Sequence, residues 1–470
     1  MNEAETIATD NSSHPPAGTP ASVNRSALLI VFLVVFIDLL GFGIVLPLLP
    51  VFAEKYVEPI VGGGQDNPMV GFVVGLLMSS FSLMQFLFAP FWGRISDRVG
   101  RRPILLLGLS GSVAFYTLFG FALSLPAESS RLALVLLFAA RIGAGFAGAT
   151  ISTAQAVIAD STPPEKRKHG MALIGAAFGI GFTFGPLFGY GSLLWFENNH
   201  EVIGYTAAAL SFVALLLGIR LLPETRRMQV HSTLRRKILD FSAWKWALTS
   251  RPLWPVVVTF FLATLGFGAF EVTLALLLRD ALGLKPDGTL LVFAYVGFVL
   301  AFTQGFLYRR LARRVSETTF MAIGIVLMAV GVAGLGAISF LAFAGPGSQL
   351  DTQLSVGASG YLAFREANCP PLFLLLLALA AAVIGYAFLT PSATALVSRR
   401  TEGERQGEIL GVNQSAASMA RILGPILGVT LYKAGADHML PYIYGSVLLV
   451  LMLPLVPLIR RGGKDASPEH

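Results

Sequence analysis

Charged residues are scarce in this chain. Only 13% of its 470 residues are Asp, Glu, Lys or Arg, whereas 54% are hydrophobic. An ordinary soluble protein carries roughly twice that charged fraction. Because a chain of this composition cannot cover its surface with polar groups, we exclude a soluble globular protein and expect lipid to be its solvent.

Three further absences restrict the chemistry. The single cysteine, Cys369, excludes an intramolecular disulfide. The chain has no Gly-x-x-x-x-Gly-Lys motif, which argues against an ATP-driven pump. Its six histidines lie in predicted loops or tails and form no cluster with cysteine. We therefore expect no enzyme, no catalytic residues, no cofactor and no metal site, and any transport must draw on an ion gradient or on the solute's own gradient.

Long apolar runs are abundant instead. Twelve of them have the length of about 20 residues that a helix needs to cross the hydrocarbon core. They must be helices, because lipid offers the backbone no hydrogen-bond partners. The sequence therefore predicts an all-α integral membrane protein with twelve transmembrane helices. The predicted spans are 27–49, 70–92, 103–125, 133–156, 170–194, 203–222, 253–278, 289–308, 318–344, 371–396, 407–433 and 439–459.

The distribution of Lys and Arg predicts the orientation. Of the 34 basic residues, 26 fall on the side of the two termini and six on the other side. Basic loops face the cytoplasm, so we expect a multi-pass plasma-membrane protein, or an inner-membrane protein in a Gram-negative cell, with both termini cytoplasmic. The net charge of +7 then reflects basic loops facing an anionic leaflet. It does not indicate nucleic-acid binding.

Four short stretches recur in the same order, each six spans later. Such repeats predict two six-helix halves related by a pseudo-two-fold axis along the membrane normal, with a solute site at mid-membrane between them. The pairs are Leu40–Gly43 with Leu265–Gly268, Thr153–Val157 with Ser392–Leu396, Gly185-Pro186 with Gly424-Pro425, and the basic segment 93–102 with 309–317.

The expected organisation follows from the repeats and the spans. The first 26 residues are polar, with a single arginine, and do not resemble a cleavable signal. We predict a disordered cytoplasmic tail at 1–26, an N-terminal half at 27–222, a cytoplasmic linker at 223–252, a C-terminal half at 253–459 and a second cytoplasmic tail at 460–470.

The segment 93–102 concentrates charge and glycine between two apolar spans. We expect Gly93 to let two helices approach closely at a tight turn. Asp97 can accept bonds from a helix N-terminus or pair with arginine. One interpretation is a latch between the halves that opens and closes during transport; the other is a topological turn alone. The second copy carries Arg313 where the first carries Asp97, so we expect an asymmetric latch.

Four ionisable residues lie well inside predicted spans, away from their ends: Asp38, Arg141, Glu271 and Arg421. Each costs about 2.5–3.5 kcal/mol if it faces lipid, by insertion scales, which favours a function. Asp38 lies roughly 16 Å from the inner face and Arg141 roughly 12 Å from the outer one. We expect the two to share a cavity and interact. Asp38 then either carries a proton or forms a fixed structural pair.

The other two ionisable residues lie in the C-terminal half. Glu271 lies roughly 25 Å along its span, where it could be a second proton or cation site or an outer gate residue. The counter-charge of Arg421 is either Glu271 or an acidic group of the substrate. Polar side chains on otherwise apolar spans are further candidates for the cavity lining, although inter-helix hydrogen bonds explain them equally well. With Arg421 they are Gln85, Gln155, Gln304, Thr394, Asn413 and Gln414.

The fifth span is rich in glycine. Its small residues let backbones pack closely, and Pro186 removes one helical hydrogen bond and bends the helix. Beyond plain packing, this pattern suggests a pivot between the halves. The residues concerned are Gly181, Gly185, Pro186 and Gly189.

Together these motifs resemble those of major facilitator superfamily transporters over nearly the whole chain. The matches to that superfamily's loop between helices two and three are Gly93, Asp97, Arg98, Gly100, Arg101 and Arg102.

Further stretches resemble the drug:proton antiporter branch. Asp38–Gly43 is similar to helix one of tetracycline-resistance efflux pumps, Arg141 with Gly145 to the helix-four motif, and Gly181–Gly189 to the antiporter motif of helix five. The resemblance implies the major facilitator fold and proton-coupled efflux, by alternating access, of a small amphiphilic or drug-like molecule. Asp38, Arg141 and Glu271 are our candidates for the coupling residues.

Two other functions stay open. One is a proton symporter or facilitator for a sugar or another metabolite; the other is a non-transporting receptor on a transporter fold. The expected partners are a small-molecule substrate, protons and the lipid bilayer. The sequence is compatible with a monomer and does not determine the oligomeric state.

Overall fold

The computed structural model describes residues 25–64, 66–162, 167–197, 199–224, 242–343, 371–401 and 406–463, and all the regular elements there are helices. The N-terminal half contains α1 (Arg25–Val45), α2 (Leu49–Val61), α3 (Pro68–Val99), α4 (Arg101–Ser124), η1 (Ala127–Ser129), α5 (Ser130–Gly148), α6 (Ile151–Asp160), α7 (Arg167–Trp195) and α8 (Val202–Leu221).

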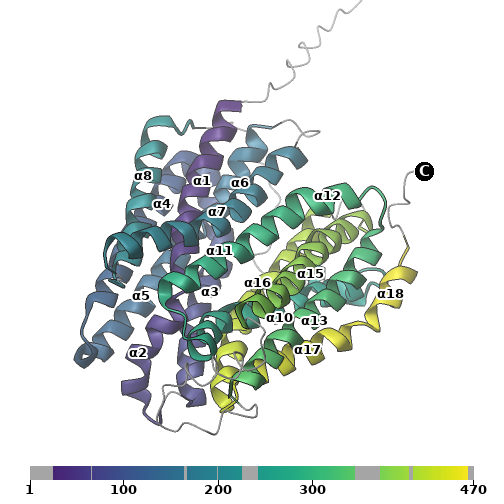
Figure 1. The fold of residues 1–470 in the computed structure, drawn as a ribbon. Coiled ribbons are helices and arrows are strands. Elements are labelled where there is room, and N and C mark those ends of the chain that lie inside the picture. Colours follow the sequence, from purple (N-terminus) through teal and green to yellow (C-terminus); the bar gives the residue numbers. More distant parts are fainter. Residues whose placement is uncertain are drawn as a thin grey trace, which may run out of the picture.

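The C-terminal half follows the same plan. It contains α10 (Trp254–Leu282), α11 (Pro286–Phe302), η3 (Thr303–Leu307), α12 (Tyr308–Leu311), α13 (Glu317–Phe343), α15 (Pro371–Arg399), α16 (Gln406–Ala434), α17 (Leu440–Met452) and α18 (Leu455–Arg461). The two halves stand beside each other (Figure 1). In the linker, α9 (Ser242–Thr249) packs against α10 and α16, whereas residues 225–241 lie outside the described ranges.

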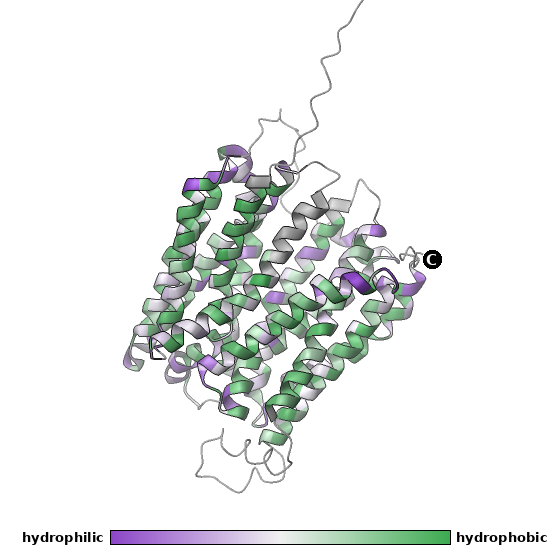
Figure 2. Ribbon diagram, turned by 45° about the horizontal axis from the view of Figure 1, so that its top comes forward, coloured by the Kyte–Doolittle hydropathy of each residue, from purple (hydrophilic) through white to green (hydrophobic). Residues whose placement is uncertain are grey.

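Ten helical stretches are long and apolar enough to cross a membrane. Hydrophobic residues cover their lengths, and hydrophilic residues gather near their ends (Figure 2). The two remaining predicted spans correspond to α7 and α16, which have 29 residues each and pack between neighbours from both halves. The twelve-helix architecture expected from the sequence is therefore confirmed, with α5–α6 and α17–α18 each forming one broken span.

Close glycine contacts show the internal repeat in three dimensions. In the N-terminal half a Cβ on Gly185 would lie 2.9 Å from the Cα of Gly43, so α7 and α1 touch backbone to backbone. In the C-terminal half Gly424 of α16 packs in the same way on Gly268 of α10. The Leu-Gly-Phe-Gly and Gly-Pro repeats thus mark equivalent helix crossings.

A second set of glycines brings the halves together. A Cβ on Gly71 or Gly75 of α3 would meet the α16 backbone at 2.4 or 2.6 Å. A Cβ on Gly297 of α11 would lie 2.5 Å from the carbonyl oxygen of Phe182 in α7. The α3–α16 and α7–α11 pairs are therefore the close contacts between halves, and they surround the centre of the molecule.

The basic segment 93–102 is less of a loop than the sequence suggests. α3 continues to Val99, α4 begins at Arg101, and Gly100 alone separates them. Gly100 has φ +119°, a conformation that other residues adopt only under strain. The prediction for Gly93 is wrong in this structure, because a Cβ there would find its nearest neighbour, Ser152, at an ordinary 3.8 Å.

Candidate functional site

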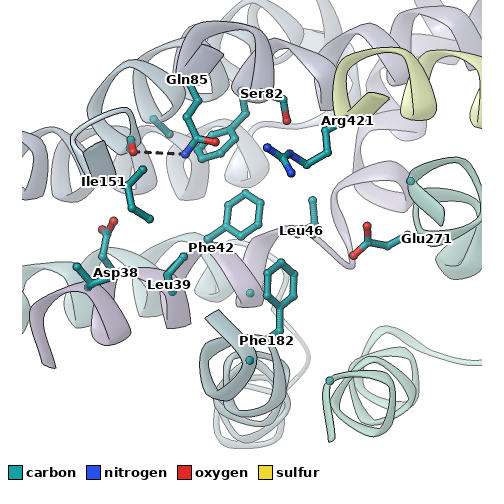
Figure 3. Close-up of a pocket in the computed structure, with 18 of the residues that line it drawn as sticks. Asp38, Leu39, Phe42, Leu46, Ser82, Gln85, Ile151, Phe182, Glu271 and Arg421 are labelled. Atoms are coloured by element: carbon teal, nitrogen blue, oxygen red, sulfur yellow. Dashed lines mark hydrogen bonds between the residues drawn. The ribbon is translucent and has the colours of Figure 1, made fainter. Parts of the chain in front are cut away.

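A cavity of about 490 Å³ lies at the centre, between the two halves. Residues of α1, α3, α5 and α7 line it on one side, and residues of α10, α11 and α16 line it on the other. Figure 3 shows Asp38 and Glu271 toward opposite edges of this space, with Phe42 between them. The volume falls within the range of sites for drug-sized ligands.

Asp38 enters the cavity from α1. The Ser211 hydroxyl donates a hydrogen bond to its carboxylate at 3.4 Å, and Ser112 lines the cavity beside it. Arg141 lines the same cavity, as expected from the sequence, but the described residues show no ion pair between the two within 4.0 Å. Tyr116 lines the same cavity as both groups. The predicted direct interaction is therefore absent in this state.

Arg141 lies among aromatic rings instead. Its guanidinium carbon is 4.7 Å from the ring centre of Phe81 and 6.0 Å from that of Phe42, and the residue is only 2% exposed. Its Nε and Nη1 atoms are buried and have no hydrogen-bond partner in the described part of the chain. Cation–π attraction offsets part of this cost, but two donors stay unsatisfied.

Glu271 and Arg421 form the matching pair in the C-terminal half. Both line the cavity, and Figure 3 shows the two side chains approaching it from different helices. Arg421 donates to the Ser418 hydroxyl at 3.1 Å and interacts electrostatically with Tyr386 and Glu271. The described residues again show no ion pair within 4.0 Å. Glu271 therefore lies at the central cavity in this structure, and its role as a second proton or cation site or as an outer gate residue stays a prediction.

Four of the predicted neutral polar residues line the cavity: Gln85, Gln155, Gln304 and Gln414. Thr394 and Asn413 do not, which corrects the prediction for them. Thr390, one turn before Thr394 on α15, lines the cavity instead. One helical turn moves a side chain about 5.4 Å along the helix axis, which takes Thr394 out of the cavity.

Gln85, one of the predicted lining residues, donates to the Gly148 carbonyl oxygen at 3.3 Å, the bond drawn in Figure 3. The lining also includes residues that the sequence argument missed. Phe267 and Tyr386 stack with ring centres 3.9 Å apart. Tyr116 and these aromatic residues gave no signal in the sequence, because many similar side chains simply face lipid.

Comparisons with known proteins agree with this architecture. The family model described as Major Facilitator Superfamily matches residues 31–350 and 352–470. The chain belongs to this superfamily of membrane transporters. It is 29% identical to the class C tetracycline resistance protein of Escherichia coli over 442 residues, which cover 93% of this chain and 98% of that protein.

Two further relatives support the membership. The chain is 25% identical to the quinolone resistance protein NorA of Staphylococcus aureus, over 94% of this chain and 98% of that one. Its fold is similar to the crystal structure of a D-xylose–proton symporter, with a TM-score of 0.70 and 15% identity, over 94% of this chain and 100% of that chain. A small-molecule substrate and a multi-pass location in a membrane follow from membership of the superfamily.

The superfamily's loop motif forms a polar cluster at one end of the transporter, which we call the basic end. Arg101 pairs with Asp97 at 2.6 Å and with Asp160 at 3.1 Å. The Glu224 carboxylate accepts the backbone N–H groups of Arg101 and Arg102 at 2.9 and 3.1 Å. These bonds cap the N-terminus of α4 and all join parts of the N-terminal half.

The remaining residues of the loop motif and of the fifth span lie on α3 and α7. Arg98 lies in the last turn of α3. Gly181 and Gly185 pack against α1, and Gly189 approaches Leu290 of the other half at 3.1 Å from its Cβ position. Pro186 lines the cavity. The predicted pivot therefore lies at the contact of α7 with both halves.

A second ionic cluster joins the halves at the opposite end. Glu54 of α2 contacts Arg279 of α10 and Lys433 of α16, each at 2.6 Å. The Glu54 side chain is 6% exposed and that of Lys433 is 1% exposed. Asp280 pairs with Arg279 and accepts a hydrogen bond from the Tyr432 hydroxyl. We name Glu54, Arg279 and Lys433 the opposite-end cluster.

The sequence argument missed this cluster. Its three members lie at or beyond the ends of predicted spans, where charged residues usually reach water. Only the tertiary structure shows that the helix ends converge there. A possible signal was the pair Arg279-Asp280, because two charges at the end of one buried helix need partners.

Proposed function

We propose that this transporter exports a small amphiphilic or drug-like molecule in exchange for protons. The main support is the composition of the central cavity, because each half contributes one carboxylate and one guanidinium to its lining. A carboxylate at membrane depth is costly unless it has a function. The chain's similarity to proteins named for tetracycline and quinolone resistance supports efflux of compounds of that kind.

Asp38 is the first proton acceptor in the proposal. It faces the cavity and has a hydroxyl partner, Ser211, so it can gain and lose a proton without breaking an ion pair. Glu271 is the second, in the other half. One proton that moves down about 100 mV supplies roughly 2.3 kcal/mol. This energy supports a solute gradient of about fifty-fold.

The opposite-end cluster suggests which state this is. It holds the halves together through a nearly buried carboxylate and two cations. If the basic end faces the cytoplasm, as the distribution of Lys and Arg predicts, the opposite end is the outer one. The proposal then assigns this structure to an inward-facing state, in which the substrate loads from the cytoplasm and the cluster must part before release.

Transport into inside-out membrane vesicles tests the proposal. With an imposed proton gradient, acid inside, the vesicles should accumulate tetracycline or a fluoroquinolone, and collapse of the gradient should release it. Asp38→Asn should lose proton-driven uptake by at least about tenfold, because the amide cannot carry the proton. Glu128→Gln, at an exposed position outside the cavity, is the matched control and should transport normally.

Two outcomes would point to the alternatives. Accumulation of a sugar or another metabolite in right-side-out vesicles, with none of the drugs in inside-out vesicles, would indicate a symporter or facilitator. Full pumping by Asp38→Asn would remove Asp38 as the proton carrier. Absence of any substrate flux, with binding retained, would favour a receptor.

A further inference from the structure

We propose that the transported molecule is an aromatic anion whose acidic group binds to Arg141. The inference rests on the proposed function and specifies the chemistry of its substrate. It begins with an imbalance in the cavity: the carboxylate of the N-terminal half has a partner, whereas the guanidinium does not.

The burial of Arg141 is the main observation. An arginine keeps its charge at any physiological pH, and a buried charge without a partner is expensive. Nε and Nη1 are both buried and unpaired among the described residues, although the side chain lines the cavity. A carboxylate or sulfonate of a ligand would supply the missing acceptors, in the geometry for which a guanidinium is best suited.

The acidic residues do not offer the same opportunity to a cationic ligand. The Asp38 carboxylate already accepts a hydrogen bond from Ser211. An exchanger loads its substrate after Asp38 and Glu271 have released their protons, so the two carboxylates then balance the two positive charges of the arginines. The sign of the ligand is therefore decided by which group lacks a partner, and among the described residues that group is Arg141.

Arg421 places the second of these charges on the C-terminal half. It donates a hydrogen bond to the neutral Ser418 hydroxyl, and it lines the same cavity as Arg141. The two guanidinium groups therefore approach one solute from opposite halves. An anion that binds between them would contact both halves at once, as a transported substrate must.

The aromatic lining accounts for the rest of the ligand. Phe42 forms ring contacts with Phe81 at 4.8 Å and with Phe182 at 5.8 Å, and Phe81 and Phe42 are the same rings that lie under Arg141. Across the cavity, Phe267 and Tyr386 stack. Flat apolar surfaces next to a guanidinium favour a planar ring that carries an acidic substituent.

Three probes with one ring system test the inference: 2-naphthoate, its neutral methyl ester and 2-naphthylmethylammonium. Their binding to the full-length protein in lipid nanodiscs is measured by displacement of tritiated 2-naphthoate. We expect the naphthoate to bind at least about tenfold more tightly than the other two, as a charge-assisted hydrogen bond predicts. Equal or tighter binding of the ester or the ammonium probe, or no binding of any probe, overturns the inference.

Variants then locate the site. Arg141→Gln should weaken naphthoate binding by about tenfold or more and leave ester binding unchanged. Arg141→Lys, which keeps the charge but not the planar guanidinium, should recover part of the loss. Arg220→Gln, at an exposed end of α8, is the control and should bind as the unchanged protein does. A merely structural Arg141 would weaken all probes alike, and that result also overturns the inference.

Transport separates this inference from the proposed function. If naphthoate binds through Arg141 but is not taken up into inside-out vesicles when a proton gradient is imposed, the result supports the anion site and contradicts the proposed proton-driven export. Proton-driven uptake of the ammonium probe in preference to the naphthoate supports the exporter and contradicts the anion site. If Arg141→Gln does not fold, the ranking of the three probes on the unchanged protein still decides.

Discussion

At the scale of single residues, two glycines of the same motif have different physical roles. Gly100 combines a positive φ of +119° with a Cβ position only 2.6 Å from an oxygen of Glu224. Gly93 lies inside α3 and has free space around its Cβ position. The motif alone made them look equivalent. The structure shows that only Gly100 is required by the backbone in this state.

This difference predicts the effect of two matched substitutions. Gly100→Ala should lower the thermal unfolding temperature of the protein in detergent, because it strains the backbone and displaces the carboxylate that caps α4, at a cost of about 1–3 kcal/mol. Gly93→Ala should change the stability by less than about 0.5 kcal/mol in either direction. Equal destabilisation by both would mean that the turn adopts another conformation in solution.

At the scale of helices, glycine determines how closely the two halves approach. Small residues allow contacts between backbones that lipid-embedded helices otherwise lack. α3 meets α16 at Gly71 and Gly75, and α11 meets α7 at Gly297. These crossings surround the cavity, so the distance between the helices also determines the shape of the space that holds the substrate.

Gly297→Ala should therefore impair both packing and transport. The added methyl group would lie 2.5 Å from a backbone oxygen of α7, and backbone cannot yield as a flexible side chain can. Overpacking of this kind costs about 1–3 kcal/mol, which should appear as a lower unfolding temperature and slower drug uptake in vesicles.

Gly191→Ala in α7 is the control, since nothing lies within 4 Å of its Cβ position. It should equal or exceed the unchanged protein in stability, because alanine favours a helix over glycine. Normal transport by Gly297→Ala would show that α7 and α11 are farther apart in the working protein.

At the scale of the whole molecule, the two ends differ in what their charges hold together. The bonds of Arg101 and Glu224 at the basic end stay within the N-terminal half. The opposite-end cluster joins one half to the other. The predicted latch of Asp97 across the halves stays a prediction for another state of the transport cycle.

Loss of the opposite-end cluster should shift the conformational equilibrium. Glu54→Gln leaves two cations near each other without their carboxylate, and removal of one partner from a buried ion pair costs about 3 kcal/mol or more. Arg279 is 27% exposed, so part of this cost is screened. The state closed at this end should become markedly less populated.

Spin labels at Lys55→Cys and Ala436→Cys, in a Cys369→Ser background, report the distance between the halves at this end. Glu54→Gln should broaden the distribution toward longer distances. Glu128→Gln, which lies outside the cluster, should leave it unchanged. An unaltered distribution in Glu54→Gln would mean that helix packing alone closes this end.

Much of the fold could be predicted, because membrane insertion depends on local features. Length and apolarity identified nearly all spans, and the repeated Leu-Gly-Phe-Gly and Gly-Pro stretches indicated two related halves. The departures have local causes as well. The basic segment 93–102 became two helices with one glycine between them, since Arg94–Val99 contains nothing that stops a helix.

The candidate site was predictable only in part. The cost of a charge in lipid identified Asp38, Arg141, Glu271 and Arg421 from the sequence, and all four line one cavity. Depth along a helix could not show which direction a side chain faces, so Thr394 and Asn413 were assigned to the lining and Thr390 was missed. Depth also could not show that Asp38 has a hydroxyl partner while Arg141 lies between phenylalanine rings.

The sequence alone is sufficient for the solvent, the number of spans, the internal repeat and the superfamily. The solvent and the spans follow from the transfer of residues between water and lipid, which depends on the residues themselves. The repeat and the superfamily follow from short stretches and motifs that can be compared without a structure. The partners of the charged groups depend on tertiary structure, because helices far apart in the chain bring them together. Contacts between helices assembled the opposite-end cluster. They also left Nε and Nη1 of Arg141 without a partner among the described residues, and the proposed substrate site is inferred from these two unpaired atoms.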